Sequence, residues 1–220
     1  ADFNPKKAFN DEIIPFSFHS EDLSGKGRNK EAFRQKHGLA QDDSMLVAIS
    51  GRLDQQKGTD VILQIAERLL SSGIQIAIVG SGFDRYPDER LDDLRARFPQ
   101  SYVFLKYEDS GIGTDEETFL MAAADVYLMP SRFEPCGLGQ MKAQKMGCLP
   151  IANATGGLID TIQNGETGFL FQGVTADSVE RAVLEVYRLY RENRVQFQTM
   201  AARAMQLEYS WDRVAALWEA

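Results

Sequence analysis

The sequence has few cysteines and no pattern typical of a structural zinc site. Cys136 and Cys148 are its only two cysteines in 220 residues, which is too few for a disulfide framework. A reducing cytoplasm is therefore the expected compartment. No Cys/His cluster has the spacing of zinc ligands, so we expect no metal.

Long apolar runs and an excess of basic residues are also missing. The apolar segments are far shorter than the roughly 20 residues of a membrane-spanning helix, and the polar start ADFN is unlike a secretory signal. The formal net charge of −8 argues against a protein that binds nucleic acid by neutralising phosphates over a wide surface. It remains compatible with a small anion held by a few local cations. Since the chain does not begin with Met, we expect a piece of a longer protein.

What the sequence does contain is a regular alternation of short apolar runs and helical patterns. Turn signals fill residues 1–28, and a helix is expected at 29–37. Strands are predicted at 45–49, 74–79, 102–105, 126–129, 149–151 and 169–171. Helices are predicted at 59–70 (capped by Thr59), 88–98, 115–124, 139–146, 157–163, 175–191, 194–205 and 211–220. The alternation predicts an α/β fold, a doubly wound parallel sheet of about six strands. Such sheets bind ligands beyond the carboxyl ends of their strands.

The turn at residues 130–139 (PSRFEPCGLG) joins a predicted strand to a predicted helix. Backbone N–H groups at the start of a helix can hold an anion, and Glu134 can accept hydrogen bonds from hydroxyls. This combination suits a sugar that carries a phosphate. An ordinary loop stopped by proline is the alternative.

Residues 50–58 (SGRLDQQKG) follow the first predicted strand. Gly51 lets the backbone approach a ligand closely. Arg52 and Lys57 can turn toward one anion, the first as a bidentate donor and the second as a point charge. The segment is neither a Walker A motif nor a dinucleotide fingerprint. A solvated basic pair is the alternative interpretation.

Three further turns carry weaker signals. Gly80 and Ser81 either bring backbone near a phosphate or only form a turn. Tyr107 follows the third strand, where it can stack on a nucleobase or be a partly buried surface aromatic. Thr155 and Gly156 precede another helix, which makes them a second possible contact to an anion or a sugar hydroxyl.

Taken together, these motifs resemble one family, the starch/glycogen synthases of the bacterial and archaeal type. These are retaining glycosyltransferases with two Rossmann-like domains, the GT-B architecture. The resemblance rests on residues 50–54 (SGRLD), 57–58 (KG), 130–138 (PSRFEPCGL) and 155–158 (TGGL), and extends to 22–26 (DLSGK) and 210–211 (SW). It covers almost the whole chain. The RFEPCGL string is specific, whereas the Arg/Lys pair is shared by many retaining GT-B enzymes.

The resemblance implies the following roles. Arg52 and Lys57 would hold the donor diphosphate and stabilise the leaving group, and Glu134 would bind hydroxyls of the transferred glucose. Glucose would pass from ADP-glucose or UDP-glucose to the non-reducing end of an α-1,4-glucan with retention, without a metal or another cofactor. The implied substrate-binding residues are Gly51, Gly80, Ser81, Tyr107, Cys136, Gly137, Leu138, Gly139, Thr155 and Gly156, with Cys136 contributing its backbone N–H.

Two departures from the family pattern stand out. Many retaining GT-B enzymes have a second Glu eight positions after the first. This chain has Lys142 at that position, and starch/glycogen synthases commonly lack the second Glu too. Ribose recognition must therefore come from elsewhere. A Thr is common at the position of Gly139, so one hydroxyl contact to phosphate is expected to be missing.

The resemblance also implies that this chain is the carboxyl-terminal, donor-binding half of a GT-B enzyme, inactive alone. We expect residues 1–38 to form an arm or linker and first helix, and 39–220 the nucleotide-sugar-binding domain. The acceptor-side domain would be a missing partner, and the helix at 211–220 would lie partly exposed with Trp211 and Trp218.

Other functions remain open on the sequence alone. One is a non-catalytic nucleotide- or glucan-binding module. The others keep the fold but change the enzyme, to a sugar-nucleotide epimerase or to a phosphorylase, which would need a lysine bound to pyridoxal phosphate. Neither nucleic acid nor a membrane is an expected partner.

Overall fold

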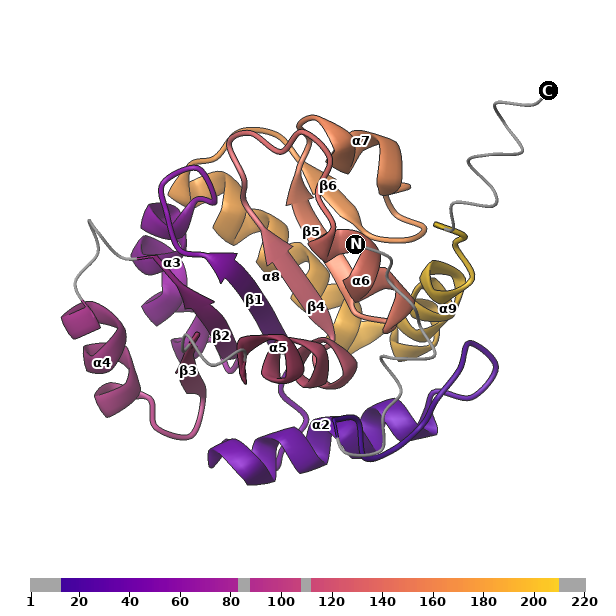
Figure 1. Ribbon diagram of the computed structural model, residues 1–220, viewed down its shortest axis with the longest axis horizontal. Coiled ribbons are helices and arrows are strands. Elements are labelled where there is room, and N and C mark those ends of the chain that lie inside the picture. Colours follow the sequence, from indigo (N-terminus) through magenta and orange to yellow (C-terminus); the bar gives the residue numbers. More distant parts are fainter. Residues whose placement is uncertain (1–12, 83–87, 108–111, 210–220) are drawn as a thin grey trace.

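The computed structural model describes residues 13–82, 88–107 and 112–209 and contains one six-stranded parallel sheet (Figure 1). Its strands are β1 (Leu46–Arg52), β2 (Gln75–Ser81), β3 (Tyr102–Lys106), β4 (Val126–Met129), β5 (Leu149–Asn153) and β6 (Phe169–Phe171). They lie in the order β3-β2-β1-β4-β5-β6. The chain builds outward from β1 in one direction and returns to build outward from β4 in the other. This doubly wound arrangement confirms the predicted fold class.

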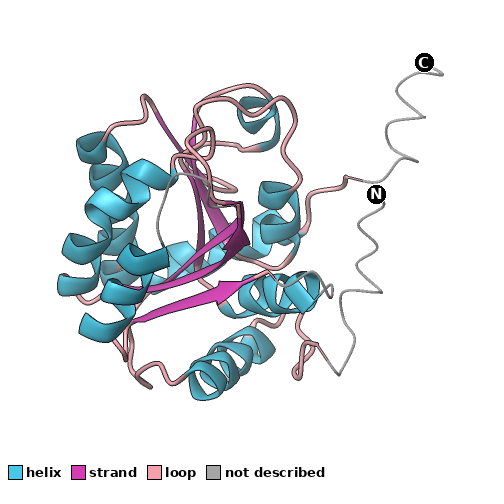
Figure 2. Ribbon diagram, turned by 60° about the vertical axis from the view of Figure 1, so that its left-hand side comes forward, coloured by secondary structure: helices cyan, strands magenta, loops and turns pink. Residues whose placement is uncertain are grey.

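Helices pack along both faces of the sheet (Figure 2). They are α2 (Ser24–His37), α3 (Thr59–Ser71), α4 (Asp88–Arg97), α5 (Ile112–Ala123), α6 (Gly139–Lys145), α7 (Gly157–Thr161), α8 (Ala176–Glu192) and α9 (Arg194–Met205). The predictions for β4, β6 and α9 match these bounds. The helix predicted at 211–220, with Trp211 and Trp218, lies outside the described residues.

Strand residues alternate between two hydrophobic cores because successive side chains point to opposite faces of a sheet. Met45, Val47 and Ile49 pack into the core beneath α3 and α8. Leu46 and Ala48 pack into the other core, beneath α5 and α6. Both faces of the sheet are thereby covered, as the fully apolar strands require.

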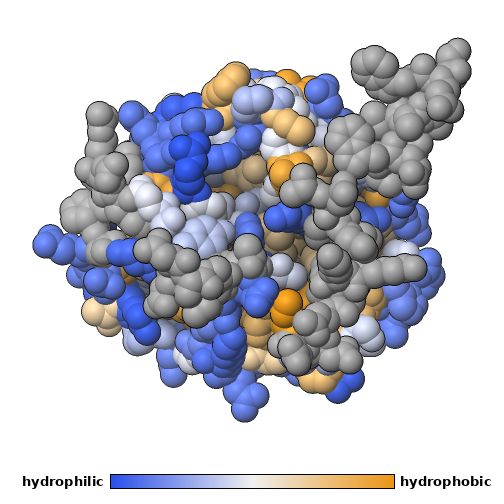
Figure 3. All heavy atoms as spheres, in the orientation of Figure 1, coloured by the Kyte–Doolittle hydropathy of each residue, from blue (hydrophilic) through white to orange (hydrophobic). Residues whose placement is uncertain are grey.

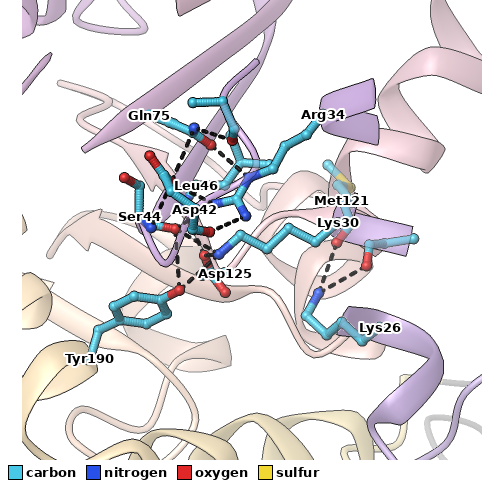
Figure 4. Close-up of polar contacts among 12 residues, drawn as sticks. Lys26, Lys30, Arg34, Asp42, Ser44, Leu46, Gln75, Met121, Asp125 and Tyr190 are labelled. Atoms are coloured by element: carbon cyan, nitrogen blue, oxygen red, sulfur yellow. Dashed lines mark hydrogen bonds and ion pairs between the residues drawn. The ribbon is translucent and has the colours of Figure 1, made fainter. Parts of the chain in front are cut away.

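Helix α2 crosses the amino ends of the strands and fixes them with three cations spaced four residues apart (Figure 4). Lys26 donates to the carbonyls of Met121, Ala122 and Met146 at the carboxyl ends of α5 and α6. The negative ends of the two helix dipoles stabilise a cation at this position. Burial lowers the pKa of Lys26 to about 8.

The other two cations of α2 bind the starts of strands. Lys30 contacts Asp125, the carbonyl of Ser44 and the hydroxyl of Tyr190. Arg34 donates to Gln75 and to the Ser44 carbonyl. Burial also lowers the pKa of Lys30. These contacts tie α2 to the segments that begin β1, β2 and β4.

Two local predictions are wrong. Helix α2 begins at Ser24 rather than 29, so Gly25 lies inside it and is not a turn. The Cβ of any other residue at position 25 would lie 2.0 Å from the carbonyl oxygen of Ser17, which explains the glycine by close packing. Thr59 is not the cap of α3: Gly58 is the N-cap, in the left-handed conformation. The predicted domain boundary at residue 38/39 stays a prediction.

The surface in Figure 3 is largely hydrophilic at its outline, with smaller hydrophobic patches between. No helix of the described segments is long and apolar enough to cross a membrane. Exposed large apolar side chains include Phe133, Leu138 and Ile159, all from turns or helices that follow β4 and β5.

Candidate active site

The order of the strands brings the two strongest sequence motifs together. β1 pairs directly with β4, so the turns that follow these strands meet at the point where the winding reverses. Parallel α/β sheets bind ligands at such a point. A cavity of about 200 Å³ lies here. It is lined by residues 49–53, 57, 59, 62, 117, 127–129, 131, 134, 137–139 and 142.

Lys57 and Glu134, which both line the cavity, form an ion pair. The two residues are separated by 77 positions in the chain. Glu134 is 7% exposed, and Ser131 lies within 3.5 Å of its carboxylate. Because the Glu134 carboxylate is nearly buried, its charge needs a partner, and Lys57 is that partner.

Arg52, the second predicted cation, lies at the rim of the same cavity. Its side chain is 66% exposed and forms an ion pair of 3.2 Å with Asp54. A weaker contact of 3.4 Å joins it to Gln56. Arg52 and Lys57 therefore both reach the cavity, but only Lys57 is held inside it.

Arg132 ties the two site loops to each other. Its guanidinium forms two hydrogen bonds of 2.7 Å with the carboxylate of Asp60, in the first turn of α3. The backbone N–H of Arg132 donates to the carbonyl of Gln56, whose side chain donates to the carbonyl of Phe133. These bonds fix the loop that carries Lys57 against the loop that carries Glu134.

The turn at residues 155–157 contacts the backbone of Glu134. The N–H of Gly157 donates to the carbonyl of Glu134 at 3.1 Å. Gly156 has φ of +48°, and a Cβ there would lie 2.0 Å from the same carbonyl oxygen. Only glycine fits both the conformation and the space. Residues 155–157 therefore lie against the Glu134 turn as packing, and they do not line the cavity.

A second group of polar side chains, Ser50, Glu117 and Tyr127, lines the same cavity, which Lys142 also lines. The Ser50 hydroxyl donates to Glu117 at 2.6 Å and lies 2.9 Å from the hydroxyl of Tyr127. Burial first, and then the charge of Glu117, raise the pKa of Tyr127. The Tyr127 ring also explains Gly139, where a Cβ would lie 2.7 Å from the tyrosine oxygen. A threonine at position 139 has no room beside Tyr127.

The structure gathers some of the predicted site residues and leaves others apart. Those that line the cavity are Gly51, Arg52, Lys57, Glu134, Gly137, Leu138 and Gly139. Those that do not are Gly80, Ser81, Tyr107, Cys136, Thr155 and Gly156. Gly80 packs against β1, since its Cβ would meet the Gly51 carbonyl at 2.4 Å, and the Cys136 side chain is exposed and unpaired. The binding roles of all these residues stay predictions.

Sequence reasoning missed Glu117, Tyr127 and Thr59. Tyr127 carried a usable signal, because a tyrosine near the end of an otherwise apolar strand needs a partner for its hydroxyl. Glu117 carried none, since its neighbour Glu116 looks the same in sequence yet pairs with Lys36 and His37 on α2. Thr59 lines the cavity with a buried hydroxyl that has no hydrogen-bond partner.

Comparison with known proteins identifies the family. The model of the family described as glycosyl transferases group 1 matches residues 29–203. This chain belongs to that family. Its relatives among group 1 glycosyl transferases include the glycogen synthase of Xanthomonas campestris pv. campestris (strain 8004), 39% identical over 203 residues. The glycogen synthase of Marinomonas sp. (strain MWYL1) is 36% identical over 222 residues.

Solved structures of glycosyl transferases have the same fold. The catalytic domain of starch synthase IV from Arabidopsis thaliana, bound to ADP and acarbose, superposes with a TM-score of 0.86 at 28% identity over 96% of this chain. The C-terminal domain of a group 1 family protein from Francisella tularensis superposes with a TM-score of 0.65 at 17% identity, covering 92% of this chain and 98% of that domain. The second likeness concerns the fold alone.

The group 1 chain described here is shorter than these relatives. The match to the Xanthomonas glycogen synthase includes 92% of this chain but only 41% of that relative. The Marinomonas match includes 99% of this chain and 45% of that relative. For the starch synthase IV structure the share is 44%.

Proposed function

We propose that this chain is the donor-binding half of a glycogen or starch synthase, which transfers glucose from ADP-glucose or UDP-glucose to an α-1,4-glucan with retention. The observation that carries the proposal is the Lys57–Glu134 pair inside the cavity between β1 and β4. A phosphate needs a cation, and a sugar needs a hydrogen-bond acceptor. This pair offers both within one contact. The glycogen synthase relatives support the choice of reaction.

Lys57 and Glu134 would separate when the donor binds. The Lys57 ammonium would move to the diphosphate and stabilise the charge that develops on the leaving group. The Glu134 carboxylate would then accept hydrogen bonds from hydroxyls of the glucose. Arg52 would swing from Asp54 at the rim to close over the phosphates, as its exposure permits.

The remaining partners follow from the length of the relatives. We propose that an acceptor-side domain, absent from these 220 residues, completes the active site and binds the glucan. A cytoplasmic location is part of the same proposal. It is supported by the two cysteines, both of which are free thiols.

Calorimetric titration tests this function on the 220-residue chain. We expect ADP-glucose or UDP-glucose to bind, with ADP or UDP as a competitor, and no glucosyl transfer without the acceptor-side domain. Glucose 6-phosphate serves as the control for unspecific anion binding. Absence of heat with all four nucleotides would remove the proposed function.

A further inference from the structure

The cavity between β1 and β4 contains two different polar groups. One is the ion pair of Lys57 and Glu134. The other consists of the Ser50 hydroxyl, the Tyr127 hydroxyl and the Glu117 carboxylate, and the cations Arg52 and Lys142 also line the cavity. Glu117 and Glu134 are the two carboxylates among the described residues that line this cavity. Glu134 is paired with Lys57, whereas Glu117 is held by the hydroxyl groups of Ser50 and Tyr107.

The contacts of Glu117 hold its carboxylate at the cavity wall. Ser50 donates to one carboxylate oxygen at 2.6 Å. The Tyr127 hydroxyl contacts both the side chain and the carbonyl of Ser50, at 2.9 and 3.2 Å. Burial and then the adjacent Glu117 charge raise the pKa of Tyr107, which also hydrogen-bonds to Glu117. Glu117 thus connects the cavity to the ring predicted to stack on the base.

An ionised carboxylate excludes some ligand groups and selects others. It repels a phosphate, whose oxygens are also acceptors. It attracts hydroxyl groups, because a carboxylate has about four lone-pair sites and accepts only. Hydrogen bonds to a charged acceptor are stronger than neutral ones. The ligand group that contacts Glu117 should therefore be a polyol.

We propose that Glu117 binds the vicinal 2′- and 3′-hydroxyls of the donor's ribose. This inference rests on the proposed function, because it takes the ligand to be a sugar nucleotide. The order of groups along such a ligand is base, ribose, diphosphate and sugar. Glu117 contacts Tyr107, which is predicted to stack on the base, and lines the cavity that also contains Lys57 and Glu134. A ribose on Glu117 would therefore lie between a base on Tyr107 and a diphosphate on Lys57.

The test compares ADP with 2′-deoxy-ADP and 3′-deoxy-ADP by calorimetry on the 220-residue chain. The intact protein should bind ADP about tenfold more tightly than either deoxy form, since one hydrogen bond to a charged group is lost. Glu117→Ala removes the acceptor of both hydroxyls, so it should weaken the binding of ADP by more than about tenfold and that of each deoxy nucleotide by about tenfold. The three nucleotides should then bind about equally. Glu117→Gln keeps the shape and should lose part of the preference, so it decides the question if the alanine variant does not fold.

Glu116→Gln is the matched control, because it removes the neighbouring charge on α5, which faces Lys36 and His37 instead of the cavity. It should keep the preference for ADP. If the Glu117 variants also keep the full preference, or if the intact protein binds all three nucleotides equally, the ribose assignment is overturned while the proposed function stands. Binding of none of the three nucleotides would overturn both.

Discussion

The two edges of this sheet use the same kind of side chain for opposite purposes. At the amino edge, Lys26, Lys30 and Arg34 are buried, and their contacts are with carbonyl, carboxylate, amide and hydroxyl groups of the protein. At the carboxyl edge, Lys57 is half-buried and Arg52 is mostly exposed, each with one carboxylate partner. Cations bound to several fixed acceptors stabilise the fold. Cations with one exchangeable partner remain available to a ligand.

The difference teaches that charge alone does not locate a site. The amino edge carries more buried positive charge than the carboxyl edge, yet each of its three cations already donates to two or more protein groups. Desolvation lowers the pKa of Lys26 and Lys30, because burial disfavours the charged form of each side chain. Their contacts with the protein must offset that penalty, which identifies them as structural cations. The predictions below separate the two classes, beginning with the largest expected effect.

Lys30→Met should lower the free energy of unfolding by about 3–5 kcal/mol, because Asp125 would remain buried without its cation. Chemical denaturation monitored by circular dichroism measures this loss. The control is Lys36→Met on the same helix, where the side chain is half-exposed and the ion pair with Glu116 is worth about 0–1 kcal/mol. Equal losses for both variants would contradict the structural assignment of the amino edge.

Gly139→Thr should cost about 1–3 kcal/mol of stability, because its Cβ would lie against the Tyr127 ring. Adding Tyr127→Leu should recover most of that loss, and a double-mutant cycle measures the coupling. Gly27→Ala serves as the control, since nothing lies within 4 Å of that Cβ position on α2. A cycle without coupling would argue that the tyrosine moves aside freely.

Lys57→Ala should weaken the binding of ADP about tenfold or more, through loss of a charge-assisted contact to the diphosphate. Arg52→Ala should have a smaller effect, because its side chain is 66% exposed. Arg52→Ala should unfold at nearly the same temperature as the parent, whereas Lys57→Ala should unfold at a lower temperature, because it leaves the nearly buried Glu134 carboxylate without its cation. Isothermal titration gives the affinities, and an Arg203→Ala variant, remote from the cavity, controls for the loss of one positive charge. A larger effect at Arg52 would reverse the ranking.

The smallest effect concerns acid stability. Hydrogen bonding to His37, followed by contacts with Lys36, holds the pKa of Glu116 at about 2, below its usual 4.5. A carboxyl group with a lowered folded-state pKa stabilises the protein above its unfolded pKa, and that contribution is lost as the pH falls. Unfolding between pH 4.5 and pH 2 should therefore depend less on pH in Glu116→Gln than in the parent. If the free energy of unfolding depends on pH in the same way in both proteins, the contacts of Glu116 with Lys36 and His37 add nothing to acid stability.

Much of the fold follows from local patterns, and much of the site does not. The apolar runs predicted β4 and β6. The turn at 130–139 was predicted to form part of a binding site, and its residues 131, 134 and 137–139 line the cavity. The beginning of α2 was missed, because Gly25 and Gly27 are turn signals locally while the burial of Lys26 is a tertiary effect. The contact of Lys57 with Glu134 depends on β1 pairing with β4, and no sequence spacing contains that information. Glu116 and Glu117 are alike in sequence and differ only in which neighbours α5 gives them.

The ion pair between Lys57 and Glu134 makes the proposed binding of the donor an exchange of partners. A complete sugar nucleotide satisfies both groups at once, since its phosphate takes Lys57 and its sugar takes Glu134. A nucleoside diphosphate without the sugar takes Lys57 and leaves a nearly buried carboxylate uncompensated beside its own negative charge. The site would therefore bind the sugar nucleotide more tightly than the nucleoside diphosphate, so the diphosphate product would dissociate more readily than the donor.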